Sequence, residues 1–364
     1  MSDGEQDVSG SNASGFGRLV PQTTGRPVRS EIPSASCVPK ATLAPIGGKI
    51  NCVTQAQEML QDMGISFDLP VDEIIQNIPP KRLAEFTDCC DSTGVYRELV
   101  DYCQAKGQDV VCVTSGSEAH ALRNAQFNKL AFRLFGVANV HAITNRSEAD
   151  TDAMAGIIAD KNTRLVYLDG GGQEGLAENF VGTKAHAAMM RRYITGEAYD
   201  KESETWVPDP TFTVGGSSAG AAGMPGKGTM IVDWNNECSA PVMGDGLGML
   251  EHVIIETHLH REGKIPRLPR LQLAVEKCPN CMGIGLDEET GVLIRDGVAT
   301  VIGNQQVWTM TPEQVQERKD RITQGETIEH VYPSYVKGQT FELGEYARLT
   351  VPPGQRSALA AVAR

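Results

Sequence analysis

The sequence has few aromatic residues and no long apolar run. Phe, Trp and Tyr make up 5% of its 364 residues, whereas glycine occurs 38 times. This composition favours an α/β domain with tight strand-to-helix turns over an aromatic-rich β-sandwich. No stretch of about 18 residues is apolar, so no membrane-spanning helix is predicted. Residues 1–36 lack the basic segment followed by an apolar segment that is typical of a signal peptide. We therefore expect a cytoplasmic protein without a membrane partner.

The sequence also lacks a regular cysteine framework and an excess of positive charge. Its nine cysteines are scattered and odd in number, which indicates free thiols in a reducing compartment. The formal net charge is −13 and the sequence pI is about 5.1. Such a charge repels phosphate backbones, so nucleic acid is not an expected partner. The same charge would attract a cationic peptide, although ordinary solubility explains it as well.

Short apolar segments alternate with segments of helical character along much of the chain. This alternation predicts an α/β fold of three layers, with a mostly parallel central sheet and helices on both faces. Functional groups in such sheets gather at the carboxyl ends of the strands. Glycine-rich strand ends are predicted here at 47–48, 170–172 and 215–220. The predicted strands are 41–46, 109–113, 140–144, 164–168, 211–214, 252–257, 282–286, 291–295 and 298–302, and the predicted helices are 119–135, 148–160 and 176–194, with a polar loop at 196–210.

Composition divides the chain into three parts. Residues 1–36 are rich in Ser, Gly, Asp and Pro and poor in apolar residues, which predicts a disordered tail over residues 1–40. We expect a catalytic domain over residues 41–345 and a C-terminal tail over residues 346–364.

The clearest local motif is Gly216-Ser217-Ser218-Ala219-Gly220, which fits G-x-S-x-G after a predicted strand. A sharp strand-to-helix turn would hold Ser218 in a strained conformation and expose its Oγ as a nucleophile. The N–H groups of the helix that follows would face a developing oxyanion. A plain glycine-rich turn is the alternative. A phosphate-binding loop is excluded, because Gly226-Lys227 is followed by Gly228 and not by Ser or Thr.

A serine nucleophile needs a base, and the chain has seven histidines. His258 follows the apolar run 253–255, so it is expected at a strand's carboxyl end and is the best candidate, with His260 second. These two histidines also suggest a zinc site, but no third ligand is marked by its spacing. Cys278-Pro279-Asn280-Cys281 is a C-x-x-C motif without a second pair, which indicates ordinary thiols.

The sequence pattern defines the acid and the oxyanion donors of such a site less clearly than it defines the serine and the histidine. A carboxylate must hold the base, and Asp287, Glu288 and Glu289 follow a predicted strand; the residues alone do not choose among them. The run Gly170-Gly171-Gly172 at another strand end can present N–H groups to an oxyanion. Gln173 directly after it could bind a polar group of a substrate.

Taken in chain order, these blocks resemble the cyanophycinase and dipeptidase E family of serine peptidases, with cyanophycinase the nearer. The resemblance covers roughly residues 43–310. It differs from α/β-hydrolases, because the histidine precedes the acid. The blocks that carry it are Pro45-Ile46-Gly47-Gly48, Gly170-Gly171-Gly172-Gln173, Gly216 to Ala221, Glu256 to Leu268, and Gly283-Ile284-Gly285-Leu286-Asp287-Glu288.

The resemblance implies a fold like that of class I glutamine amidotransferases, also described as flavodoxin-like. It implies Ser218 as nucleophile, His258 as base and Glu288 as the third member. It further implies oxyanion N–H groups from Gly171 and Ala219, substrate contact by Gln173, independence of metals and cofactors, and a homodimer. Cyanophycinases cleave the β-Asp-Arg polymer cyanophycin by exo-attack.

The positions that set substrate specificity depart from the family's pattern. Glu256-Thr257 replaces Asp-Gln before the histidine, and of three family arginines only Arg267 remains. Lys264 keeps one positive charge, whereas Glu262 reverses another. These five residues are our predicted substrate contacts besides Gln173. A segment over residues 50–105 is longer than the family norm, and we expect it to be an inserted helical lid or dimer surface.

The sequence thus predicts a serine-type hydrolase of peptide or isopeptide bonds that works through an acyl-enzyme. Two alternatives stay open: a dipeptidase or amide hydrolase of different specificity, and a catalytically silent binding protein with a rebuilt pocket.

Overall fold

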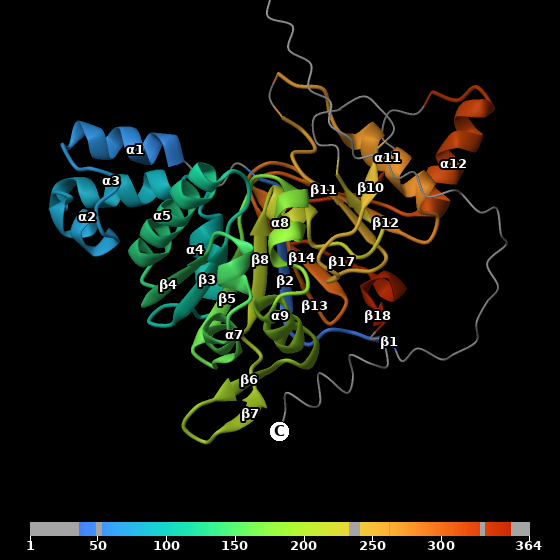
Figure 1. The fold of residues 1–364 in the computed structure, drawn as a ribbon. Helices are drawn as coiled ribbons and strands as arrows, with labels where there is room; N and C mark the ends of the chain where they lie inside the picture. Colours follow the sequence, from blue (N-terminus) through green and yellow to red (C-terminus); the bar gives the residue numbers. More distant parts are fainter. Residues whose placement is uncertain (1–35, 49–52, 233–240, 262, 328–331, 351–364) are drawn as a thin grey trace, which may run out of the picture. The chain divides into compact units, whose positions relative to one another are not determined.

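A computed structural model describes residues 36–48, 53–232, 241–261, 263–327 and 332–350 of the chain, and its main element is an eight-stranded sheet (Figure 1). The strand order is β17-β14-β13-β2-β8-β5-β3-β4. The five strands from β2 to β4 pair in parallel, and β13, β14 and β17 are added by antiparallel pairing. The α/β prediction with a mostly parallel sheet is confirmed. The strands are β2 (Thr42–Ile46), β3 (Asp109–Val113), β4 (Asn139–Ile143), β5 (Thr163–Leu168), β8 (Thr213–Ser217), β13 (Thr290–Arg295), β14 (Val298–Gly303) and β17 (Thr340–Glu342).

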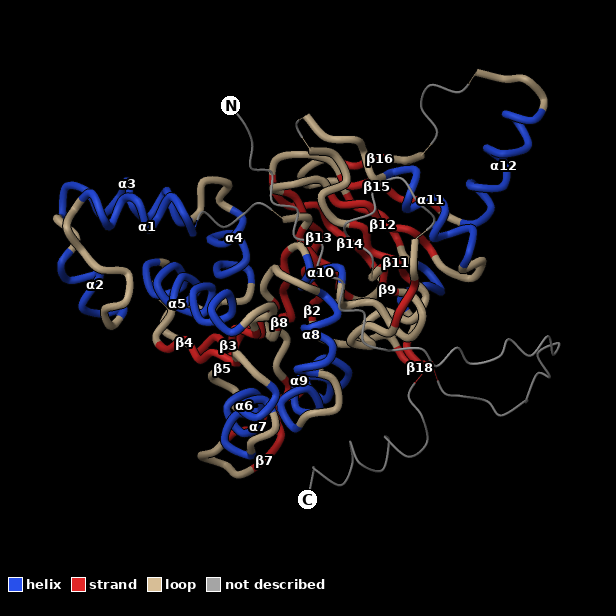
Figure 2. Tube along the Cα trace, turned by 45° about the horizontal axis from the view of Figure 1, so that its top comes forward, coloured by secondary structure: helices blue, strands red, loops and turns tan. Residues whose placement is uncertain are grey.

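Successive strand residues point into two hydrophobic cores on opposite faces of this sheet. On β2, Leu43 belongs to one core and Ala44 to the other; on β5, Leu168 and Tyr167 divide in the same way. This alternation follows from the period of two along a strand. Helices cover both cores, which gives three layers (Figure 2). The Leu43 core packs against α6 (Arg146–Ala149), α7 (Asp152–Ala159), α8 (Gln173–Phe180) and α9 (Lys184–Thr195).

The predicted inserted segment contributes four helices to the opposite face. Together with α5 (Glu118–Leu134), they bury their apolar side chains in the core that contains Ala44 and Tyr167. Pro80 at the start of α3 suits a first helical turn, where a backbone N–H has no partner to lose. The four helices are α1 (Val53–Asp62), α2 (Val71–Asn77), α3 (Pro80–Cys90) and α4 (Val95–Tyr102).

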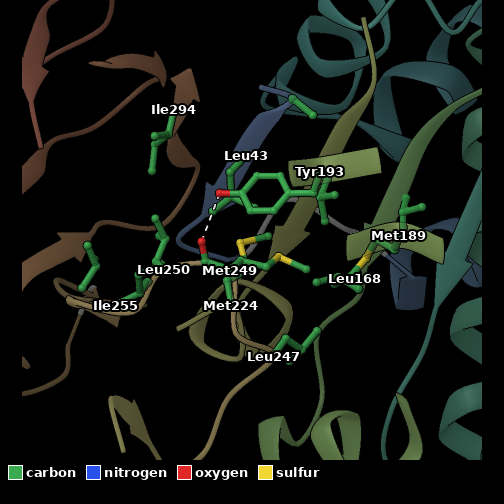
Figure 3. Close-up of a cluster of buried hydrophobic side chains, with 14 of the residues drawn as sticks. Leu43, Leu168, Met189, Tyr193, Met224, Leu247, Met249, Leu250, Ile255 and Ile294 are labelled. Atoms are coloured by element: carbon green, nitrogen blue, oxygen red, sulfur yellow. Dashed lines mark hydrogen bonds between the residues drawn. The ribbon is translucent and has the colours of Figure 1, made fainter. Parts of the chain in front are cut away.

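Methionine, leucine and isoleucine side chains pack around Tyr193 in this core (Figure 3). Tyr193 of α9 is 2% exposed, and its hydroxyl donates a hydrogen bond of 3.1 Å to the Met249 carbonyl. Met224, Leu247 and Leu250 are buried in the same core. The hydroxyl thus satisfies a backbone acceptor in an apolar environment, and it anchors the segment around Met249 to the main domain.

A second, smaller sheet was not predicted. Its order is β11-β12-β15-β16, and only β11 and β12 pair in parallel. The predicted strand 252–257 lies here as β11 and does not join the central sheet. A third hydrophobic cluster forms where α11 (Leu268–Lys277) and α12 (Pro312–Thr323) pack on this sheet. The strands are β11 (Val253–Glu256), β12 (Met282–Leu286), β15 (Val307–Met310) and β16 (Ser334–Tyr335).

Two of the predicted helices are each two helices. The range 148–160 contains a break before α7, where the Thr151 hydroxyl accepts the Met154 N–H. The range 176–194 breaks between α8 and α9, where Thr183 caps α9 by accepting the His186 N–H. A threonine side chain that caps a helix start competes with helix continuation, which the apolar periodicity alone did not reveal. The predicted polar loop 196–210 contains the hairpin β6 (Glu197–Asp200) and β7 (Thr205–Pro208).

The structure describes a few residues of each predicted tail. β1 (Ser36–Cys37) pairs antiparallel with β18 (Leu349–Thr350), and Leu349 is 3% exposed in the main core. Residues 1–35 and 351–364 lie outside the described residues. Within the described ranges, every helix falls short of the length and apolar character that a bilayer crossing demands.

Candidate active site

Ser218 lies in a sharp turn between β8 and the short helix α10 (Ala219–Ala222). Its backbone has φ 54° and ψ −117°, a conformation that non-glycine residues rarely adopt. The turn is possible because its neighbours are small: a Cβ on Gly220 would lie 2.0 Å from the Leu168 carbonyl oxygen, and one on Gly216 would lie 2.9 Å from the Gly220 carbonyl carbon. The predicted strained elbow is therefore present at Ser218, with a positive φ that holds the side chain at the end of the central sheet.

Three side chains from different elements form a continuous hydrogen-bonded series at this turn. Ser218 Oγ lies 2.8 Å from His258 Nε2, and His258 Nδ1 lies 2.8 Å from Glu288 Oε1. Ser218 directly follows β8 of the central sheet, His258 follows β11 of the second sheet, and Glu288 lies between β12 and β13. The imidazole and the carboxylate are 21% and 17% exposed. This geometry lets the imidazole accept the serine proton while the carboxylate stabilises the resulting positive charge.

The segment Gly47–Gly48 positions His258 from the other side. The His258 N–H donates to the Gly47 carbonyl at 2.9 Å, and the Glu289 N–H donates to the Gly48 carbonyl at 2.9 Å. Gly48 has φ +114°, and a Cβ there would lie 2.3 Å from His258 Cε1. His258 itself has φ 50°. The glycine turn after β2 therefore ties the second sheet to the first and leaves room for the imidazole.

Two residues are predicted to donate backbone N–H groups to an oxyanion, Ala219 and Gly171. Ala219 is the first residue of α10, so its N–H has no acceptor within the helix. Gly171 has φ +140°, and a Cβ there would lie 2.7 Å from Ser115 Oγ, so only glycine fits. The neighbouring Gly170 lies against Ser218, since a Cβ on it would be 3.9 Å from Ser218 Oγ. Ala219 directly follows Ser218 and Gly171 directly follows Gly170, and the role of their N–H groups as oxyanion donors stays a prediction.

The predicted substrate contact Gln173 is buried in the protein. Its side chain is 5% exposed, and Nε2 donates to the Ile231 carbonyl at 2.8 Å. Ile231 belongs to β9 (Met230–Ile231), which pairs with β10 (Met243–Gly244). In this arrangement the Gln173 amide supports the segment beyond α10 and does not reach a substrate through its donor.

Glu256 and Arg267 also lie in different surroundings from those predicted. Glu256 is 3% exposed, and both its oxygens accept hydrogen bonds of 2.8 Å from the Arg270 guanidinium. Arg267 Nη1 lies 3.5 Å from the same carboxylate and donates to the Thr257 carbonyl at 3.1 Å. Burial lowers the pKa of Arg267, and Glu256 opposes that effect. The carboxylate neutralises two internal arginines, so it is a structural ion pair and not an exposed substrate contact.

The other predicted substrate contacts are Thr257, Lys264 and Glu262. The Thr257 side chain is buried, with 4% exposure of the residue, whereas Lys264 is exposed. Glu262 lies outside the described residues. Lys264 is therefore the one predicted contact among the described positions whose charge faces solvent.

His260 has a carboxylate partner of its own. Its Nδ1 lies 2.7 Å from Asp287 Oδ1, and its ring contacts Trp308 at a centroid distance of 5.4 Å. Asp287 and Glu288 thus hold separate imidazoles. Among the described residues, no group of three or more His, Cys, Asp or Glu side chains is arranged as a metal site. The C-x-x-C residues are free thiols, and burial raises the pKa of Cys281 to about 12.

Two buried charged residues near the site were not predicted from the sequence. Arg270 is the main partner of Glu256, and a glutamate at the end of an apolar strand was a signal that a cation must lie nearby. Asp169 is fully buried directly before Gly170-Gly171-Gly172, and its carboxylate accepts the Gly170 N–H at 2.7 Å. An acid between an apolar strand and three glycines was the available signal.

Comparison with known proteins identifies relatives over part of the chain, although no protein-family model matches it. A cyanophycinase of Synechococcus elongatus is 27% identical over 224 residues, which are 60% of this chain and 64% of that protein. A cyanophycinase of Nostoc sp. is 26% identical over 57% of this chain and 64% of its own length. One of Geminocystis herdmanii is 30% identical over 38% and 46% of the two chains. The chain therefore spans less than two thirds of these curated relatives.

A solved structure described as a peptidase from an acI-B1 Actinobacterium superposes on 84% of this chain and 97% of its own, with a TM-score of 0.49 and 16% identity. The sequence matches confirm the resemblance seen in the motifs. The chain is a distant relative of the cyanophycinases.

Proposed function

We propose that the protein is a serine hydrolase that cleaves peptide or isopeptide bonds through an acyl-enzyme. The observation that carries the proposal is the series Ser218 Oγ, His258 and Glu288, with 2.8 Å at each step. Those contacts match the distances at which a base can take a proton from a nucleophile and an acid can orient the base.

The reaction would proceed in two halves. Ser218 Oγ attacks the scissile carbonyl carbon while its proton passes to His258 Nε2. The N–H groups of Gly171 and Ala219 stabilise the negative charge on the carbonyl oxygen. The C–N bond then breaks as His258 returns the proton to the leaving amine, which leaves an ester on Ser218. Water enters with His258 again as base, and the ester is hydrolysed to the free acid.

Glu288 has two roles in this scheme. It keeps the imidazole in the tautomer whose Nε2 is free to accept the serine proton, and it stabilises the imidazolium that forms. Asp287 does not take this role, because its carboxylate accepts a hydrogen bond from the His260 backbone N–H and lies 2.7 Å from His260 Nδ1. The backbone bond from His258 to Gly47 fixes the base independently of the acid.

The substrate class follows from the relatives. The resemblance to cyanophycinases favours a β-Asp-Arg polymer or a related Asp-containing peptide. The internal pairing of Glu256 with Arg270 removes one predicted pocket charge, so a dipeptide of different composition is the principal alternative. Incubation with cyanophycin and with a panel of Asp-containing dipeptides, followed by mass spectrometry of the products, separates these specificities.

A substrate-independent test uses a fluorophosphonate probe, which reacts with activated serines. We expect the wild-type protein to be labelled at Ser218, and S218A to lose both labelling and turnover while keeping its circular dichroism spectrum. S217A changes the adjacent serine of the same motif and serves as the matched control that keeps its label. A folded wild-type protein without label and without turnover on the substrate panel would support a silent binding protein instead.

A further inference from the structure

A second imidazole–carboxylate pair lies beside the series of Ser218, His258 and Glu288. His260 Nδ1 is 2.7 Å from Asp287 Oδ1, and the His260 backbone N–H donates to the same oxygen at 3.1 Å. His260 follows His258 by two residues, and Asp287 directly precedes Glu288. Consecutive Cα atoms are about 3.8 Å apart, so the two pairs lie close together. The proposed reaction uses only the pair of His258 and Glu288, which leaves the second pair to be explained.

The Asp287 carboxylate joins three segments of the second sheet. Asp287 directly follows β12, and its Oδ1 binds His260, which lies beyond the end of β11. Its Oδ2 accepts the N–H of Gln306, the residue before β15, at 3.3 Å, and the Asp287 N–H donates to the Gln306 carbonyl at 3.2 Å. Asp287 is 7% exposed, and a carboxylate so deeply buried requires hydrogen-bond partners. These bonds therefore fix the start of the turn that carries Glu288.

The His260 ring is restrained although its side chain is 38% exposed. An ionised carboxylate only accepts hydrogen bonds, so the proton between the ring and Asp287 belongs to Nδ1. The ring also contacts Trp308 of β15 at a centroid distance of 5.4 Å. With its backbone N–H bound to the same carboxylate, His260 supplies two of the three donors that hold the Asp287 side chain.

Leu259 packs the two histidines against the two acids. It is 0% exposed, and its N–H donates to the Leu286 carbonyl at 3.1 Å. A Cβ on Gly285 would lie 2.7 Å from Leu259 Cδ2, so glycine leaves the room that this side chain needs. Residues 258–260 therefore lie along residues 286–288, and each of the two acids in this segment contacts one of the two imidazoles.

We propose that His260 is a positioning residue of the hydrolase: by anchoring Asp287 it fixes the turn from which Glu288 reaches His258. Glutamate has a long, flexible side chain, so the direction of the Glu288 carboxylate depends on the backbone that carries it. A shift of that turn would lengthen the 2.8 Å contact between Glu288 Oε1 and His258 Nδ1. This inference rests on the proposed function, because it assigns a role within that reaction.

The test measures the second-order rate of fluorophosphonate labelling at Ser218 in variants whose circular dichroism spectra match the wild type. H260A removes the Nδ1 donor and the contact with Trp308, and we expect about a tenfold slower reaction. Loss of the orienting acid itself costs far more, about ten-thousand-fold in a serine protease triad. H260N places an amide donor near the position of Nδ1 and should recover part of the rate. H141A is the matched control, because His141 Nε2 also lies near a carboxylate, 3.6 Å from Asp109 at the start of β3. It should react like the wild type.

A double-mutant cycle separates this positioning role from a general loss of structure. In an E288A background no acid is left to position, so adding H260A should not slow the residual labelling further, as measured by intact-protein mass spectrometry. An equal tenfold loss in that background, or H260A alone labelled within twofold of the wild-type rate, would overturn the proposal. These results differ from failure of the proposed function itself, in which the wild-type protein is not labelled at Ser218 at all.

Discussion

Replacing Asp169 by asparagine tests whether the protein keeps a charge in its interior at a cost in stability. The side chain is fully buried between β5 and α5, and asparagine is nearly its isostere. Burial raises the pKa of Asp169 from an ordinary value of 3.8 to about 6 in the folded protein. The folded state therefore binds this proton more tightly than the unfolded chain does.

The sign and size of the effect follow from that difference. Stability from the bound proton is fully present below about pH 4 and is lost as the pH rises through about 6. A difference of about two pKa units corresponds to about 3 kcal/mol over the whole range. Asparagine does not titrate, so D169N lacks this loss. The free energy of unfolding of D169N minus that of the wild type should rise by about 2–3 kcal/mol between about pH 4 and pH 8.

Urea unfolding of both proteins at several pH values measures this difference, and any constant packing change cancels in the comparison. D209N is the matched control. Asp209 is 4% exposed and pairs with Arg192, which is 0% exposed, and with Arg164. Loss of that carboxylate leaves a buried guanidinium without its partner, so D209N should be destabilised at neutral pH. A difference between D169N and wild type that stays constant from about pH 4 to pH 8 would refute the reasoning on Asp169.

Two further substitutions test the site's framework. G48A places a Cβ 2.3 Å from the His258 ring and forces alanine to adopt φ +114°. We expect this variant to lose most labelling at Ser218 with an unchanged circular dichroism spectrum. A wild-type labelling rate would show that the imidazole has another position in solution. E256Q removes the negative charge that Arg270 and Arg267 share in the interior. We expect the free energy of unfolding, measured by urea titration, to fall by about 3–5 kcal/mol. An unchanged free energy would mean that water reaches these arginines.

The strained turn at Ser218 could be predicted because its signal is local. A strand, small residues and the serine are adjacent in sequence, and the elbow depends only on them. His258 was found by the weaker argument that functional groups follow strands, although its strand belongs to a second sheet that the alternation did not reveal. The acid could not be chosen from residues alone. Only the fold shows that Asp287 turns to His260 while Glu288 turns to His258.

The predicted substrate contacts were less accurate for a physical reason. A charged residue beside an apolar strand can face solvent, a ligand or an internal partner, and the sequence does not give its partner's position in space. Glu256 is paired with Arg270, 14 residues further along the chain and on α11. The same limit applied to the ends of the domain, where Cys37 pairs with Leu349 across almost the whole sequence.

The distribution of unfavourable features supports a functional reading of the site beyond any single contact. Ser218 and His258 both have positive φ, Gly48 and Gly171 have conformations that side chains avoid, and the buried charge of Asp169 lies directly behind them. The positive φ of the two non-glycine residues and the burial of the carboxylate each cost stability, and such strain persists only where the surrounding structure imposes it. By contrast, the buried carboxylate of Asp209 is matched by two arginines at the opposite ends of the strands. Positive φ also occurs at non-glycine residues elsewhere, among them Gln104, Glu204 and Asp296. What supports a functional site is therefore that strain, a buried carboxylate and the hydrogen-bonded series of Ser218, His258 and Glu288 coincide at one end of the central sheet.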